Sequence, residues 1–77
     1  MEINSFIKQL EDTIEDLPPD YIKPETDFKK IEQWDSLAML SLLAKLDSEY
    51  NVSLTAKDLN SCNTVTELYD LVKSRMQ

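Results

Sequence analysis

The fold is decided by one stretch, residues 34–50, which reads WDSLAMLSLLAKLDSEY. Large apolar side chains recur in it at the spacing of an α-helix, and they are Met39, Leu42, Leu43, Leu46 and Tyr50. A stripe of this kind marks the face that a helix buries in a protein core. We therefore predict a helix over residues 36–50 that packs through this stripe against the rest of the chain.

The start of this helix is marked by Asp35. An aspartate just before an apolar helical pattern is a preferred N-cap, because its carboxylate accepts from the free N–H groups of the first turn. Ser36 then falls in the first turn, on the surface and beside the positive end of the helix dipole. A helix N-terminus favours a phosphate nearby, so a phosphoester on Ser36 is well placed.

This segment resembles the attachment site of acyl carrier proteins. The resemblance rests on the motif Asp35-Ser36-Leu37, on the amphipathic helix behind it, and on the length, acidity and helix order of nearly the whole chain. It implies a 4′-phosphopantetheine group joined covalently to Ser36, with Asp35 as its motif neighbour and Leu37 as the apolar flank. The thiol of that group holds an acyl or aminoacyl group as a thioester. The implied partners are a phosphopantetheinyl transferase and the acyl- or aminoacyl-activating and acyl-transferring enzymes.

The chain departs from the family pattern at two places. Many members have a small residue before the Asp-Ser pair, where this chain has Trp34. Many also carry several acids on the exposed side of the second helix, and partners in fatty acid synthesis are thought to read them. Here those positions are largely Leu, Ser and Ala, so we predict a role in a dedicated pathway of lipid or secondary metabolite biosynthesis.

The helix face opposite the core stripe carries no charge. This uncharged face consists of Leu37, Leu40, Ser41, Ala44 and Ser48. A surface helix normally places charged residues there. A partly apolar face therefore indicates a surface that another molecule covers. The alternative is a chance run of residues with adequate helix propensity.

Three further helices are expected. The first covers residues 3–17 and stops at Pro18-Pro19, which cannot donate to the helix ladder. A short third helix begins after Thr55, which forms an acidic capping box with Asp58, and runs through Leu59. The fourth follows the Thr64–Glu67 capping box, and its inner stripe is Val65, Leu68, Tyr69, Val72 and Met76.

A long connection, residues 18–34, joins the first two helices. Five apolar residues are predicted to pin it to the core, and they are Tyr21, Ile22, Phe28, Ile31 and Trp34. Phe28 and Ile31 are three residues apart, which predicts a short helical turn between them. The predicted fold is all-α: a small four-helix bundle with three longer helices, a short third helix and a long loop between the first two. We expect one carrier-protein domain over residues 1–77.

Composition excludes several classes of function. The net charge is −7, and residues 1–35, with ten acids and four lysines, hold −6 of it. Such a chain repels nucleic acids and anionic membrane surfaces. There is no His, no Gly and one cysteine, Cys62, which excludes a His-based metal site, a Gly-rich phosphate loop and an internal disulfide. We expect a partly buried Cys62.

No acidic pair has a recognisable acid/base arrangement, so we expect no catalytic residue, no metal and no enzyme activity. The sequence shows neither a membrane span nor a secretory leader, which predicts a cytoplasmic protein; we also expect a monomer. Two functions remain open. One is a carrier modified on Ser36. The other is an unmodified helical protein–protein interaction module that uses the uncharged face, and an intact mass separates the two.

Overall fold

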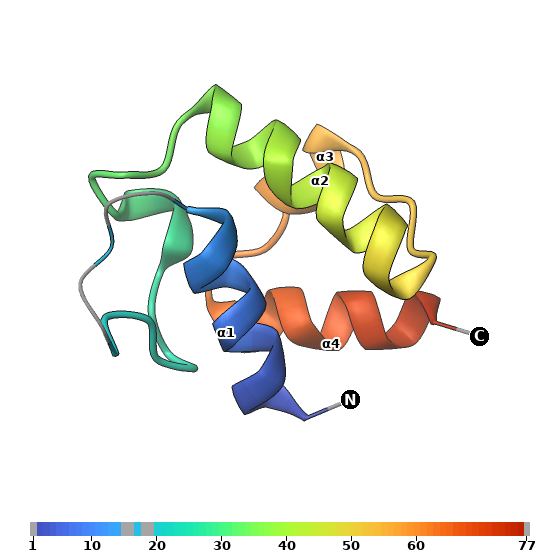
Figure 1. Ribbon diagram of the computed structural model, residues 1–77, viewed down its shortest axis with the longest axis horizontal. Helices are drawn as coiled ribbons and strands as arrows, with labels where there is room; N and C mark the ends of the chain where they lie inside the picture. Colours follow the sequence, from blue (N-terminus) through green and yellow to red (C-terminus); the bar gives the residue numbers. More distant parts are fainter. Residues whose placement is uncertain (1, 15–16, 18–19, 77) are drawn as a thin grey trace.

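The computed structural model describes residues 2–14, 17 and 20–76 of the chain. These residues form four α-helices and one short 3-10 helix, with no β-strand among them: α1 (Ile3–Thr13), η1 (Phe28–Lys30), α2 (Ser36–Tyr50), α3 (Ala56–Asn60) and α4 (Val65–Arg75). α1 packs against both α2 and α4, and in Figure 1 the long connection lies on the side opposite the C-terminus. The predicted all-α class and small helical bundle are confirmed.

The core stripe of α2 faces inward as predicted. Leu42 and Leu46 are buried, and the three other predicted members, Met39, Leu43 and Tyr50, are partly buried against the core. Ala38, which the apolar stripe does not include, is also buried. Ala38 lies one turn before Leu42 and two before Leu46, so the centre of the buried stripe runs along these three residues.

The predicted end of the first helix is wrong, because α1 ends at Thr13 and not at residue 17. Ile14 has an extended backbone, yet its side chain is buried and its N–H still donates to Leu10 O at 2.9 Å. The Ile14 side chain therefore stays in the core although the helix has ended. Acidic side chains near a helix C-terminus oppose the macrodipole, and Glu11 and Asp12 occupy the last turn of α1. Glu15 and Asp16, the other acids of this cluster, lie outside the described residues.

The long connection is pinned to the core by four of the five predicted side chains. Ile22, Phe28 and Ile31 are buried, and Trp34 packs against them in part. The predicted helical turn is the 3-10 helix η1, whose start is capped by the Asp27 carboxylate. The prediction for Tyr21 is wrong, since its side chain is 44% exposed. Its neighbour Ile22 fills the core position.

The same connection is held to the start of α4 by hydrogen bonds. Val65 N–H donates to Thr26 O at 3.0 Å, and Thr66 N–H donates to Pro24 O at 2.9 Å. The Thr66 hydroxyl also donates to Pro24 O, at 2.8 Å. The first N–H groups of a helix have no acceptor within the helix, and carbonyl oxygens of the connection accept from those of α4.

The capping residues predicted for the second half of the chain lie at its helix ends. The Thr55–Asp58 capping box is complete at α3. At α4 the Thr64 hydroxyl accepts from Glu67 N–H, but the reciprocal bond of the predicted box, from Thr64 N–H to the Glu67 carboxylate, is absent among the described residues. Asn51 ends α2 in the left-handed conformation with φ of 55°. The predicted inner stripe of α4 is confirmed: Val65, Leu68 and Val72 are buried, and Tyr69 and Met76 pack against the core. The Tyr69 ring meets the Phe6 ring of α1 edge-on at 5.7 Å.

Candidate functional site

Asp35 forms the N-cap of α2, as the sequence predicts. Its backbone is extended, and its Oδ1 accepts from Ala38 N–H at 2.8 Å. Its backbone carbonyl accepts from Met39 N–H at 3.0 Å. These two bonds leave the N–H groups of Ser36 and Leu37 without an acceptor among the described residues, because both lie in the first turn. The helix start therefore presents two donors to solvent.

Ser36 is the first residue of α2, and its side chain is exposed. Within the described part of the chain, no group forms a hydrogen bond with its hydroxyl. The hydroxyl thus lies beside unpaired backbone N–H groups at the positive end of a helix of 15 residues. A phosphate ester on this oxygen would meet donors and a favourable dipole, so the residues present suit such a group.

The approach to Asp35 is fixed by an aromatic pair. The Trp34 ring meets the buried Phe28 ring edge-on, with centroids 5.2 Å apart and planes at 80°. Trp34 N–H also donates to Ile31 O at 3.1 Å. The chain therefore enters α2 from Trp34, whose ring is anchored to the core. The bulky Trp34, a departure from the family pattern, has a structural role here.

The uncharged face of α2 is exposed, as predicted. Leu37 is 70% exposed and Leu40 is 59% exposed, and Ser41, Ala44 and Ser48 are exposed as well. Apart from Tyr21, these two leucines are the exposed large apolar side chains of the described chain. Leu37 follows Ser36 directly, so this apolar surface begins at the serine.

Other chemistry is not supported by the described residues. Cys62 is 5% exposed, its thiol donates to Asp58 O at 3.6 Å, and burial raises the pKa of the thiol, all of which disfavour a thiolate nucleophile. Over the same residues, no group of three or more His, Cys, Asp or Glu side chains could hold a metal ion. Of the helices described, none is long and apolar enough to cross a bilayer.

Comparison with known families decides the relationship of this chain. The family described as "Phosphopantetheine attachment site" matches residues 5–72, which is most of the chain. The chain belongs to this family. Domains of the phosphopantetheine attachment family carry 4′-phosphopantetheine covalently on a serine, and they are non-catalytic carriers. No curated protein and no solved structure matches the chain.

The family membership confirms the carrier class and the cofactor predicted from the sequence. It also implies interaction with a phosphopantetheinyl transferase and with biosynthetic enzymes. Sequence reasoning missed the support that Phe28 gives to Trp34. The apolar character of both residues was visible, but their contact depends on the path of the connection.

Proposed function

We propose that Ser36 carries the 4′-phosphopantetheine group of this family and that the chain delivers acyl or aminoacyl groups as thioesters. The observation that carries the proposal is the first turn of α2. Its leading residue is an exposed serine whose hydroxyl has no partner among the described residues. When bound, the group supplies a thiol that forms the thioester. The chain's own residues hold the phosphoester at the helix start, with Asp35 as the cap and the N–H groups of Ser36 and Leu37 as donors.

The test is covalent modification of the purified, unmodified chain. Incubation with coenzyme A and a broad-specificity phosphopantetheinyl transferase should add one phosphopantetheine group, seen by intact mass, and tandem mass spectrometry should place it on Ser36. Ser36→Ala should abolish the addition. Ser41→Ala is a matched control, because Ser41 is an exposed serine of the same helix outside its first turn. Circular dichroism should show that both variants are folded.

Modification that persists in Ser36→Ala contradicts the assignment of the serine. A parent chain that stays unmodified favours the other function considered from the sequence, an unmodified interaction module.

The uncharged face of α2 is proposed as the surface that partner enzymes contact. An enzyme that acts on the phosphopantetheine group must approach Ser36. The exposed Leu37 and Leu40 follow that serine on the same helix. Burying them contributes roughly 25 cal/mol per Å² of apolar surface, a contribution that depends little on salt. The absence of acids from the uncharged face of this helix favours a dedicated biosynthetic pathway over housekeeping fatty acid synthesis.

The rest of the proposal concerns the state of the protein. The chain is proposed to be a single-domain monomer of the cytoplasm without catalytic activity of its own. Its one cysteine is buried and free, which suits a reducing compartment. Light scattering on the purified chain tests the monomer.

A further inference from the structure

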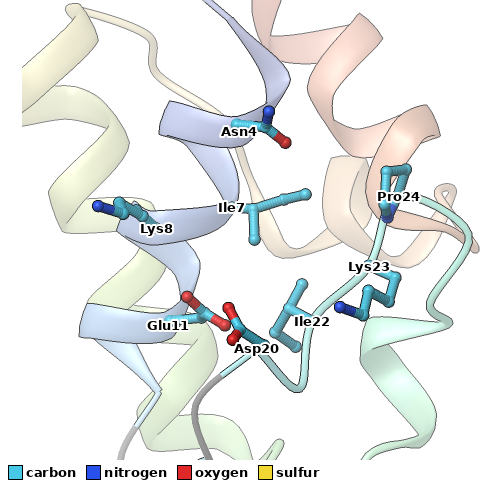
Figure 2. A pocket seen from close by; sticks show the side chains of 8 residues that line it. All are labelled: Asn4, Ile7, Lys8, Glu11, Asp20, Ile22, Lys23 and Pro24. Atoms are coloured by element: carbon cyan, nitrogen blue, oxygen red, sulfur yellow. The ribbon is translucent and has the colours of Figure 1, made fainter.

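A pocket that involves no residue of α2 lies beside α1. The pocket opens between α1 and residues 20–24, and it has a volume of about 220 Å³. Figure 2 shows Ile7 and Ile22 facing each other across it, with charged side chains around them. Both isoleucines are buried, so its floor is apolar. Pockets for drug-sized ligands have roughly 300–1,000 Å³, so this pocket suits a smaller molecule.

One end of the pocket is acidic. Glu11 and Asp20 both line the pocket, and Figure 2 draws their carboxylates on the same side of Ile7 and Ile22. Glu11 Oε2 is shielded from solvent, and none of the described residues donates a hydrogen bond to it. A shielded carboxylate oxygen without a hydrogen-bond donor is unfavourable. A ligand with an ammonium group supplies the missing donor.

Asp20 lies at a turn of the backbone. Its φ is 59°, in the left-handed region that Asp and Asn adopt more readily than most residues. Asp20 lies two residues before Ile22, which anchors this segment in the core. The carboxylate therefore projects from a segment tied to the bundle.

The other end of the pocket is basic. The Lys23 ammonium points from the loop toward Ile22 in Figure 2, whereas the Lys8 ammonium points away from the pocket. Neither ion pair found among the described residues involves Lys23. The pocket thus has carboxylates at one end, apolar side chains in the middle and one ammonium at the other end.

We propose that this pocket binds a small zwitterion of the amino acid type. The ligand's ammonium lies between Glu11 and Asp20, its apolar group lies on Ile7 and Ile22, and its carboxylate lies at Lys23. The inference does not rest on the proposed function, because none of these residues takes part in the site at Ser36. It is tested on the unmodified chain, so its outcome is independent of the modification assay.

The test uses three ligands of nearly one shape. L-Leucine carries both charges, 3-methylbutylamine lacks the carboxylate and 4-methylpentanoate lacks the ammonium. Each is titrated into the full chain while the methyl signals of Ile7 and Ile22 are followed by NMR. We expect leucine to shift both signals saturably, and each analogue to bind about fivefold more weakly or worse, because each loses one charge-assisted contact.

Charge-neutral variants assign the two ends. Glu11→Gln should weaken leucine about fivefold and leave the affinity for 4-methylpentanoate unchanged, since that ligand has no ammonium to lose. Lys23→Gln should weaken leucine about fivefold and leave the affinity for 3-methylbutylamine unchanged, since that ligand has no carboxylate to lose. Asp20→Asn keeps a residue suited to left-handed φ while removing the charge, and it should resemble Glu11→Gln. Asp12→Asn is the matched control, because Asp12 is exposed and adjoins Glu11 without lining the pocket.

Three results overturn the proposal. The first is the absence of saturable shifts at Ile7 and Ile22 with leucine. The second is an analogue that binds as well as leucine. The third is an Asp12→Asn variant that weakens leucine as much as Glu11→Gln does.

Discussion

Replacing Leu46 by alanine tests how α2 is oriented in the bundle. The Leu46 side chain is 1% exposed and belongs to the buried side of the helix, so its truncation leaves a cavity in the core. Such changes cost about 2–5 kcal/mol. A domain of this length has a total stability of about 4–12 kcal/mol, from roughly 0.05–0.15 kcal/mol per residue. Leu46→Ala should therefore remove a large part of the stability and lower Tm by about 10 °C or more.

The control is the same substitution on the opposite side of the same helix. Leu40 is 59% exposed, so Leu40→Ala should change the free energy of unfolding by less than about 0.5 kcal/mol. Urea unfolding followed by circular dichroism and by the fluorescence of Trp34, the single tryptophan, measures both variants. Coincident transitions of the two signals justify a two-state treatment. A Leu46→Ala loss below about 0.5 kcal/mol, or an equal loss in Leu40→Ala, refutes the assigned orientation.

Three further predictions concern single side chains. Leu40→Glu should weaken binding to a cognate activating enzyme at both low and high salt, and by more than Asp12→Lys does. If Leu40→Glu binds normally and Asp12→Lys binds weakly, the docking surface lies instead in the acidic residues 1–35. Hydrogen bonding from Thr55 N–H holds the pKa of Asp58 below its ordinary value, so its stabilising effect is present above that ordinary value and is lost as the pH falls through the lowered folded value. Asp58→Asn should therefore lose less stability than the parent between about pH 5 and pH 3 in urea unfolding, and an equal loss contradicts this reasoning. Burial raises the pKa of Cys62, so a thiol reagent should label it much faster in urea than in buffer, and equal rates contradict its burial.

The helices that follow the connection could be predicted from sequence because their signals are local. The capping residues Asp35, Thr55 and Thr64 each lie beside the groups they bond, and the stripe of α2 repeats over several turns. The place of Ser36 in the first turn of α2 could be predicted from the Asp35 cap. Periodicity alone could not separate Ala38 from its neighbours, because alanine is small and suits both sides of a helix.

The connection and the end of α1 were harder to predict because their structure depends on distant partners. Periodicity continues through Ile14 to Leu17, yet the helix ends at Thr13 while both later side chains still reach the core. Tyr21 and Ile22 are adjacent apolar residues, and only packing decides which one is buried. The pocket between α1 and residues 20–24 could not be predicted either, since it joins α1 to a segment whose path no local signal fixes.

The hydrogen bonds between the connection and α4 have a consequence for regioselectivity. The first turn of α4, like that of α2, contains a hydroxyl residue, Thr66. That hydroxyl and its N–H group both donate to Pro24 O, and Val65 N–H donates to Thr26 O. An incoming phosphate ester at α4 would have to displace all three bonds, whereas at α2 it would displace none among the described residues. The connection therefore occupies the hydroxyl that would compete with Ser36 for the proposed modification on the same small protein.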